Sequence, residues 1–232
     1  MKIIYNIPNI IRMAGMERIL AIKANYLAGL TGMEVVIITY EQKNLPLAFD
    51  FSDKIRFYDL DIDYAACRGK NIFWNKIRRI IYTKRHKRRL EEILLKEKPD
   101  ITISMMTGRE REWLYRLKDG SKKILECHFS YFSYQNVKGI INRYKIKRFL
   151  NKIKYYDRLV VLTEEDRKDW GRKDNIVVIP NALTFYPKES ADLSIPRVIA
   201  VGRLSAQKGF DRLIAIWAEI EPYFPDWKLT II

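Results

Sequence analysis

The 232-residue sequence predicts an α/β fold with a doubly wound parallel sheet. Two observations carry this prediction. Segments such as 34–40 and 158–162 are apolar along their length and rich in β-branched residues, which is typical of strands covered on both faces. Amphipathic segments with helical spacing lie between the strands, and this alternation is typical of a parallel sheet.

The expected elements follow one another along the chain. Each strand candidate is a short apolar run, and each helix candidate has apolar residues three or four positions apart. We expect strands at 2–7, 34–40, 55–60, 100–104, 123–127, 158–162, 176–179, 197–201 and 227–232. We expect helices at 16–30, 73–97, 109–118, 138–154, 164–171 and 209–221.

The segment 180–196 breaks this alternation, because it combines three prolines with Asn, Ser and Glu. It predicts a linker between a first domain at 1–179 and a second domain that starts at 197–232. Two strands and one helix cannot cover their own apolar surface, so we expect the second domain to be incomplete.

Positive charge is concentrated in the middle of the chain. The net charge is +15, and residues 68–158 contain 26 Lys or Arg against 9 Asp or Glu. Two basic stretches, Arg68–Arg89 and Lys138–Arg158, are interleaved with apolar residues at helical spacing. We expect the apolar residues to face the core and the cations to face an anionic partner.

The basic stretches fit an anionic membrane surface or a lipid-linked diphosphate acceptor. Nucleic acid would fit the charge equally well. The sequence has no zinc-finger spacing, RNP-like motif or base-stacking platform. Together with the motif at 201–213 described below, this leads us to expect a membrane partner and no nucleic acid. The residues expected to face the membrane or the acceptor are Arg78, Arg79, Lys84, Arg85, Lys87, Arg88, Lys145, Lys147 and Arg148.

Cysteine usage and hydropathy bear on the cellular location. Cys67 and Cys127 have neither CxxC spacing nor matching histidines, so the sequence predicts no zinc site and no disulfide framework. No segment reaches the roughly 18 apolar residues that a membrane-spanning helix needs. We therefore expect a cytoplasmic protein that lies peripherally on the inner face of the cell membrane.

The segment VGRLSAQKGFDRL at 201–213 follows an apolar strand and opens a helix. A helix N-terminus offers unpaired N–H groups and the positive end of the helix dipole. Gly202 and Gly209 allow a ligand to approach the backbone, and Arg203 and Lys208 add two charges suited to a diphosphate. An ordinary loop with two exposed cations explains the spacing equally well.

Several segments together resemble one known family. The motif VGRLSAQKGFDRLI is preceded by VVIPNAL and followed by PDWKLTI, and the first half contains AGMERILAIKANYLAGLTGMEVVIIT at 14–39. KPDITISMM, KKILECH and YDRLVVLTEEDRKDW follow in order, beginning at positions 98, 122 and 156. These motifs are similar to those of glycosyltransferase family 4, the group 1 glycosyl transferases with the GT-B fold. The resemblance extends over essentially the whole chain.

The resemblance implies how a donor is bound. In this family the arginine and lysine of the motif hold the diphosphate of a nucleotide-sugar donor, which gives that role to Arg203 and Lys208 beside Gly202. Such cations stabilise the charge that the leaving nucleoside diphosphate gains, so no metal or other cofactor is implied. A glycine pair near the donor phosphate corresponds to Ala14 and Gly15, and a plain turn is the equal alternative at Gly15.

His128 ends the strand 123–127 and should lie at the carboxyl edge of the sheet, where α/β proteins bind ligands. The family often has a histidine here, close to the transferred sugar, which implies a catalytic role. A loop histidine with satisfied ring nitrogens is the alternative. We expect Glu126 on the opposite face of the strand as a supporting carboxylate, and His86 on the solvated surface.

Asp59, Asp61 and Asp63 alternate along an extended segment. Metal-dependent glycosyltransferases of another fold use such a pattern to bind manganese and a diphosphate. The surrounding strand order does not match that fold, so we favour exposed acids at a strand end and expect no metal site.

The resemblance implies an enzyme that transfers a sugar, with retention, from a nucleotide sugar to a lipid-linked or polysaccharide-precursor acceptor at the membrane. The family's Glu-x7-Glu motif does not occur before the sequence ends at Ile232. We therefore expect a truncated donor domain and no catalysis by this chain alone. The alternative is a non-catalytic basic Rossmann module that binds anionic lipid or nucleic acid.

Overall fold

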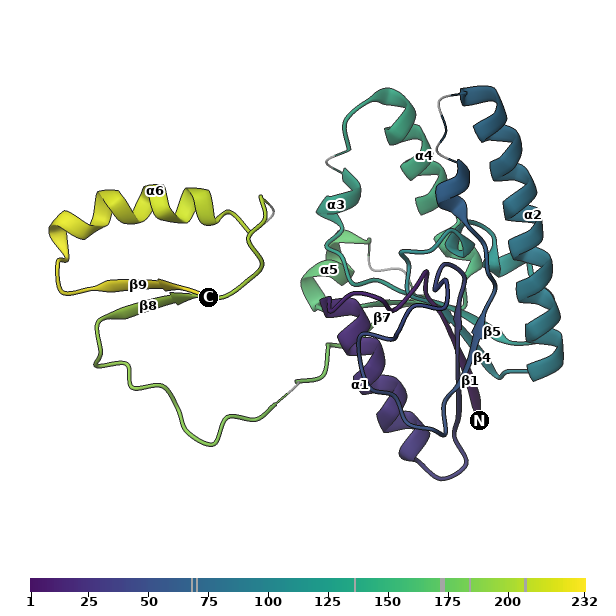
Figure 1. Ribbon diagram of the computed structural model, residues 1–232, viewed down its shortest axis with the longest axis horizontal. Helices are drawn as coiled ribbons and strands as arrows, with labels where there is room; N and C mark the ends of the chain where they lie inside the picture. Colours follow the sequence, from purple (N-terminus) through teal and green to yellow (C-terminus); the bar gives the residue numbers. More distant parts are fainter. Residues whose placement is uncertain (68, 70, 136, 172–173, 184, 207) are drawn as a thin grey trace. The chain divides into compact units, whose positions relative to one another are not determined.

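The apolar runs of the first part of the chain form one parallel sheet in the computed structural model (Figure 1). Its strands are β1 (Lys2–Asn6), β2 (Glu34–Thr39), β3 (Arg56–Asp59), β4 (Ile101–Ser104), β5 (Lys122–Glu126), β6 (Arg158–Val161) and β7 (Ile176–Val178). The order β3-β2-β1-β4-β5-β6-β7 reverses direction between β1 and β4, and all neighbours are parallel. The predicted doubly wound α/β class is confirmed.

The structure describes residues 1–232 except 68, 70, 136, 172, 173, 184 and 207. Within the predicted basic stretch, Arg68 and Lys70 thus lie outside the described residues. The chain divides into two units, Met1–Thr184 and Phe185–Ile232, and each is described by itself. The division falls inside the segment 180–196.

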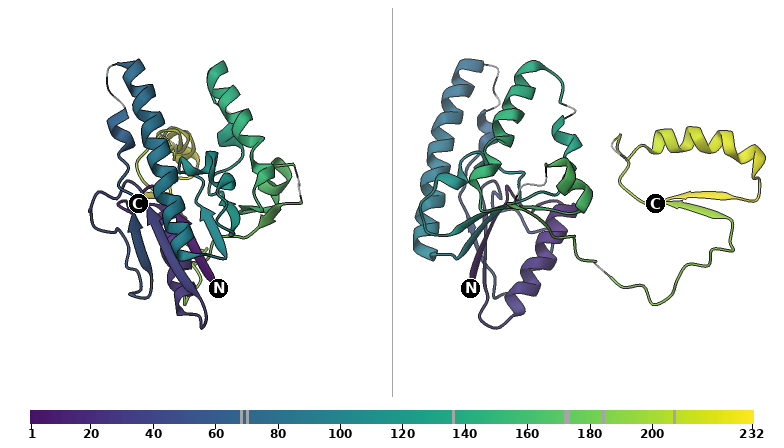
Figure 2. Two further views of the ribbon diagram at one scale, coloured as in Figure 1. Left: turned by 90° about the vertical axis from the view of Figure 1, so that its right-hand side faces the viewer. Right: turned by 180° about the vertical axis from the view of Figure 1, so that it is seen from behind.

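Helices cover both faces of the seven-stranded sheet (Figures 1 and 2). They are α1 (Gly15–Gly29), α2 (Ile72–Glu97), α3 (Phe132–Gln135), α4 (Ile140–Leu150) and α5 (Glu164–Asp169). Leu20, Ala24 and Ala28 recur every four residues along α1 and pack on one face. Leu90 and Leu94 of α2 pack on the other face. Apolar cover on both faces explains why the strands show little alternation of polar and apolar residues.

The longest helix, α2, begins where the side chain of Asn71 accepts hydrogen bonds from the N–H groups of Phe73 and Trp74. It ends at Lys98, whose backbone is left-handed with φ +48°. Within the described part of the chain, none of the helices combines the length and the apolar character needed to cross a bilayer.

The segment 109–118 does not form the single helix that its pattern predicts. Two 3-10 turns, η2 (Glu110–Glu112) and η3 (Leu114–Arg116), take its place. Trp113 separates them with φ −151° and ψ −6°, which is not a helical conformation. The Trp113 side chain is buried, so tertiary packing outweighs the helical periodicity here.

The second unit contains a β-α-β arrangement formed by β8 (Arg197–Ala200), α6 (Phe210–Ile220) and β9 (Lys228–Ile231). β8 and β9 pair in parallel, with Arg197 opposite Lys228. The βαβ segment that the sequence predicts at the start of a second domain is therefore present. Several of its apolar side chains remain exposed, for example Ile199 and Ile214, whereas Phe210 is buried.

Candidate functional site

The structure places His128 directly after β5, at the carboxyl edge of the sheet. Its Nε2 atom lies 3.0 Å from Oε1 of Glu126. The same oxygen accepts a 2.5 Å hydrogen bond from Nζ of Lys23 in α1. The expectation that Glu126 lies on the opposite face is wrong, because side chains two positions apart in an extended segment point to the same side. Lys23, Glu126 and His128 form one cluster.

The Glu126 carboxylate keeps its charge although its side chain is only 4% exposed. Burial raises the pKa of this carboxyl, but the contact with His128 and the charge and hydrogen bond of Lys23 outweigh burial, so the pKa lies below its ordinary value. Nε2 of His128 is buried and makes no hydrogen bond of acceptable geometry among the described residues, so the 3.0 Å approach to Glu126 is a close polar contact. The cluster lies at the edge where α/β proteins bind ligands.

Gly15 begins α1 at the same edge of the sheet, after β1. Ala14 is the N-cap residue and makes no side-chain hydrogen bond to the first N–H groups of the helix. A Cβ atom at Gly15 would meet no atom within 4 Å, and its φ is not positive. Neither strain nor packing requires glycine here, and the space above its backbone is open.

Arg203 and Lys208 lie in the loop between β8 and α6 of the second unit. Gly202 donates its N–H to the carbonyl of Ile232 at 2.9 Å, which ties the start of the loop to the end of β9. The Lys208 stem packs over Gly202, since a Cβ atom there would lie 3.5 Å from Lys208 Cδ. Gly209 caps α6 with φ +68°. Both cations are exposed, and the described residues place no carboxylate within 4.0 Å of either.

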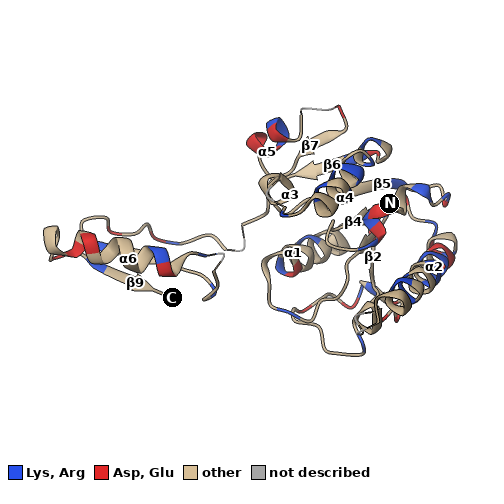
Figure 3. Ribbon diagram, turned by 90° about the horizontal axis from the view of Figure 1, so that it is seen from above, with Lys and Arg blue, Asp and Glu red and all other residues tan. Residues whose placement is uncertain are grey.

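A cleft of about 820 Å³ opens at the carboxyl edge of the seven-stranded sheet. Its lining comes from α2, from the segment after β4 and from α4 with the residues that follow it. Eight Lys or Arg side chains line the cleft, together with two carboxylates, Glu41 and Glu112. We call it the cationic cleft. Figure 3 shows the Lys and Arg of α2 and α4 in blue. The lining cations are Arg79, Lys87, Arg109, Arg111, Arg116, Lys145, Arg148 and Lys152.

The nine cations named from the sequence divide into two groups. Those that line the cationic cleft are Arg79, Lys87, Lys145 and Arg148. Those outside its lining are Arg78, Lys84, Arg85, Arg88 and Lys147. The sequence reasoning missed Arg109, Arg111, Arg116 and Lys152. Arginines at alternate positions directly after a parallel strand, as in GREREW, were the signal that could have found two of them.

Most apolar residues in the first half of α2 do not face the core, so that expectation is wrong for them, although Tyr82 packs against it. Phe73 is 66% exposed, Trp74 55% and Ile81 57%. In α4, Ile140 is 85% exposed. Both helices extend past the sheet with their N-terminal ends on the same side, in the front view and in the view turned by 90° (Figures 1 and 2). Their apolar side chains therefore reach beyond the core.

His86 is buried, which corrects the expectation of a solvated histidine. Its Nδ1 atom lies 3.0 Å from the hydroxyl of Tyr64, and its ring packs edge-on against Trp113. Burial, with a smaller contribution from the charge of Arg109, lowers the pKa of His86 to about 3. Its spacing of four residues from Leu90 was a sequence signal for this buried position.

Glu110 lies in the same core, with no exposed surface. Its Oε1 accepts a 2.7 Å hydrogen bond from Oγ of Ser104. Its Oε2 has no hydrogen-bond partner among the described residues. Burial raises the pKa of Glu110 to about 7, so near neutral pH about half of the molecules carry a neutral carboxyl.

Asp59 and Asp63 both contact Lys43, whose backbone N–H donates a 3.2 Å hydrogen bond to Oδ2 of Asp59. Asp59 Oδ1 accepts a 3.0 Å hydrogen bond from Thr39, and Asp63 forms a 3.1 Å ion pair with Lys43. Across the described ranges, no group of three His, Cys, Asp or Glu side chains is arranged to hold a metal ion. These carboxylates form local contacts at and just after the end of β3.

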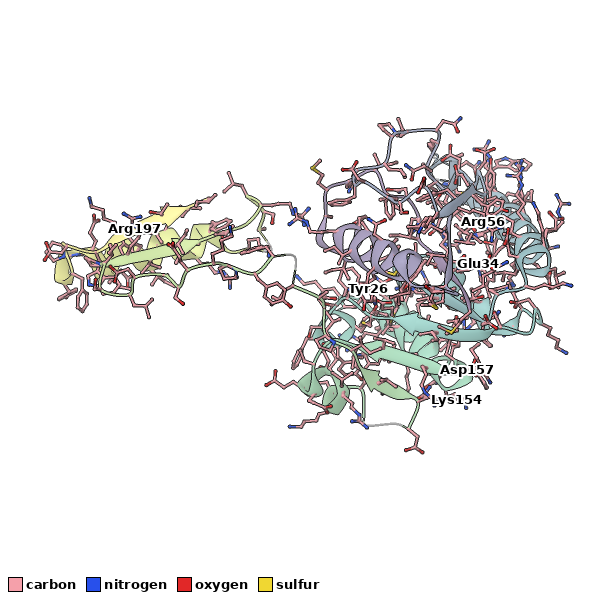
Figure 4. The ribbon with its side chains drawn as sticks, turned by 90° about the horizontal axis from the view of Figure 1, so that it is seen from below. Tyr26, Glu34, Arg56, Lys154, Asp157 and Arg197 are labelled. Carbon is pink, nitrogen blue, oxygen red and sulfur yellow. The ribbon has the colours of Figure 1, made fainter. Side chains whose placement is uncertain are left out.

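The amino edge of the sheet has a different electrostatic character (Figure 4). Nη2 of Arg56 lies 3.0 Å from Glu34 and 2.8 Å from Glu97. Nζ of Lys2 lies 3.2 Å from Glu97 as well. Cations at this edge are neutralised by carboxylates, whereas cations at the carboxyl edge are in excess.

Residues 13–184 match the family model described as Glycosyltransferase Family 4. A relative from Haemophilus influenzae, described as an uncharacterized glycosyltransferase, is 38% identical over 80 residues. That match covers 33% of this chain and 23% of the relative.

Solved glycosyltransferase structures share the fold. The apo form of the lipopolysaccharide outer core galactosyltransferase WaaB has a TM-score of 0.64 at 18% identity, over all of this chain and 60% of that one. TarM has a TM-score of 0.69 at 11% identity, over 99% of this chain and 71% of that one. The chain thus spans less than two thirds of the WaaB structure. Since the family model matches well over half of the residues, the chain belongs to glycosyltransferase family 4.

Proposed function

We propose that this chain provides the acceptor-side domain and the start of the donor-binding domain of a glycosyltransferase. The enzyme moves a sugar, with retention, from a nucleotide sugar to a lipid-linked or polysaccharide-precursor acceptor at the inner face of the cell membrane. The match of residues 13–184 to glycosyltransferase family 4 is the observation that carries this proposal. The activity is a property of the whole protein, because the chain spans only part of the relatives' length.

The donor chemistry assigns a role to each predicted site residue. When the bond between the sugar and the diphosphate breaks, the leaving group gains negative charge, and Arg203 and Lys208 stabilise that charge. Gly202 allows the diphosphate to approach the backbone, and Gly15 does the same at the open start of α1. His128, beside Glu126, contacts the transferred sugar. A variant of TarM has been solved in complex with UDP, which supports a nucleoside diphosphate as donor group.

Binding of nucleoside diphosphates to the full-length protein tests this proposal. Isothermal titration with uridine, guanosine and adenosine diphosphate should identify one preferred nucleotide. Arg203→Ala and Lys208→Ala should each weaken its binding by more than about 1 kcal/mol, as expected for a charge-assisted hydrogen bond. Arg197→Ala is the matched control, because Arg197 starts β8 at the end opposite to the loop. Unchanged affinity in both loop variants would count against the donor site.

The exposed ends of α2 and α4 support membrane association. Phe73 and Trp74 are exposed at the start of α2, and Ile140 and Ile141 at the start of α4. Both helices carry the cations that were named from the sequence, all of them exposed except the half-buried Lys87. Aromatic and aliphatic side chains among Lys and Arg are typical of helices that lie at an anionic lipid surface. The description of WaaB as a lipopolysaccharide galactosyltransferase supports an acceptor of the cell surface.

Vesicle co-sedimentation tests membrane association. The protein should sediment with vesicles that contain phosphatidylglycerol and remain in solution with vesicles of phosphatidylcholine alone. Trp74→Ala should reduce the bound fraction, since the indole loses its place at the lipid interface. Tyr26→Ala is the control, because Tyr26 is 69% exposed on α1, on the other face of the sheet. Equal sedimentation with both vesicle types would end the anionic-membrane proposal.

A further inference from the structure

We propose that the cationic cleft binds a saccharide that carries two or more phosphate groups, as part of the acceptor. The inference rests on the proposed function and names a substrate class for it. Eight cations against two carboxylates leave a large positive excess inside one cavity of about 820 Å³. A site of this charge attracts a polyanion more strongly than a neutral sugar.

The lining cations divide by exposure into two groups, which we call the floor and the rim. Those of the floor are half-buried: Lys87, Arg109, Arg111 and Lys152. Those of the rim are exposed: Arg79, Arg116, Lys145 and Arg148. Lys152 lies 2.5 Å from Glu112, whereas the described residues place no carboxylate within 4.0 Å of the other seven. Half-buried cations without counter-charges are unfavourable until an anion joins them.

Aromatic rings hold two of the floor guanidinium groups in place. Arg109 lies over the ring of Tyr64 at 4.3 Å, and Arg111 lies over the ring of Phe149 at 4.7 Å. Arg111 also donates a hydrogen bond to the backbone carbonyl of Met106. A guanidinium that is already ordered loses little entropy when its remaining N–H groups bind phosphate oxygens. The floor is therefore preorganised for phosphate.

The cations of the cleft repel one another. Burial, followed by the charges of Arg116 and Lys152, lowers the pKa of Lys87. A bound phosphate would relieve this repulsion. At the amino edge, by contrast, Arg56 contacts two carboxylates, so the fold neutralises cations where no ligand is expected.

The size and the polar lining of the cleft favour a saccharide over a lone phosphate ion. A volume of about 820 Å³ lies in the range of ligand sites that enclose whole organic molecules. Thr83 and Thr107 contribute hydroxyl groups to the lining, which suit sugar hydroxyls. Phospholipid headgroups share the phosphate chemistry, so the test separates the two sources.

Isothermal titration with glucose 1,6-bisphosphate, in the full-length protein without a donor, tests the proposal. Lys87→Met combined with Arg116→Gln should weaken binding at least about tenfold, because two charge-assisted contacts are lost. Lys96→Met with Lys118→Gln is the matched control. Lys96 is also on α2, Lys118 also follows η2, both are exposed outside the cleft, and the control removes the same charge. The control should change affinity by less than about twofold at equal ionic strength.

A second variant pair at the rim, Arg79→Gln with Arg148→Gln, lies at exposed positions and cannot disturb the core. It should also weaken binding of the bisphosphate. Absence of binding, or equal losses in the cleft and control variants, would overturn the proposal. Loss of anionic-vesicle binding in the cleft variants, without any binding of the bisphosphate, would assign the cleft to lipid headgroups and also overturn it. Nucleoside diphosphate binding at the Arg203 loop is measured separately, so a failure here is distinguishable from a failure of the proposed function.

Discussion

Replacing Lys23 with methionine is expected to lower the free energy of unfolding of the first unit by about 3 kcal/mol. Nζ of Lys23 lies 2.5 Å from Oε1 of Glu126, whose side chain is 4% exposed. Methionine fills the space of the lysine stem but leaves the buried carboxylate with His128 alone. The loss is large because an unpaired charge remains out of water. Denaturation by urea, followed by circular dichroism, measures it.

An exposed ion pair of similar geometry provides the control. Lys43 lies 3.1 Å from Asp63, but these side chains are 50% and 43% exposed. Lys43→Met should therefore change the unfolding free energy by less than about 1 kcal/mol. Adding Glu126→Gln to Lys23→Met should recover much of the loss, since the isolated charge disappears. Equal losses in the Lys23 and Lys43 variants would show that burial of Glu126 has no energetic consequence.

Glu110→Gln and His86→Gln are expected to change the pH dependence of stability in opposite directions. The pKa of Glu110 is raised from 4.5 to about 7 by burial, so between these pH values the folded state holds a proton that the unfolded state has released. Its contribution to stability therefore falls as the pH rises from 4.5 to 7. The groups that face Glu110 are Ser104, which donates a hydrogen bond, and Arg111, whose charge lowers this pKa.

The pH dependence of the stability contribution has the opposite sign for His86. Its pKa is lowered from 6.5 to about 3, first by burial and then by Arg109, so between these values the unfolded state binds a proton that the folded state does not. Its contribution to stability falls as the pH drops from 6.5 to 3. Tyr40, Tyr64 and Trp113 are the other groups in contact with the ring. Between pH 4.5 and 6.5, Glu110 and His86 change the free energy of unfolding by about 1.4 kcal/mol per pH unit each, with opposite signs. Their contributions therefore cancel in this window.

Urea denaturation of both variants between pH 4.5 and 6.5 tests this cancellation. On acidification across the window, Glu110→Gln should lose about 3 kcal/mol relative to the parent protein, because the His86 term remains. His86→Gln should gain about the same amount, because the Glu110 term remains. Parallel pH profiles for the parent and both variants would contradict the assigned pKa directions.

The strand positions and the doubly wound class were accessible from the sequence because buried parallel strands are continuous apolar runs with helices between them. The edge position of His128 follows from the same rule, since it ends such a run. The single helix predicted over 109–118 was wrong, because Trp113 turns into the core and breaks the helical conformation. Local periodicity contains no information about that packing.

Contacts between distant segments were the other limit. Lys23 and Glu126 are 103 positions apart, and no local pattern pairs them. The basic residues around His86 suggested a solvated helix. The His86 side chain nevertheless lies on the buried face of α2, together with Leu90. The first half of α2 shows an amphipathic pattern, but there is no sheet beneath it, so Trp74 stays exposed. The residue pattern predicts which face of a helix is apolar. It does not predict whether another part of the protein covers that face.

The uneven pairing of charges at the two sheet edges gives the first unit an electric dipole moment that runs along its strands. A polyanion that diffuses toward the protein experiences a torque before contact and meets the cationic end first. Encounter rates with such ligands should consequently decline as rising ionic strength shortens the Debye length below the distance between the two charged edges.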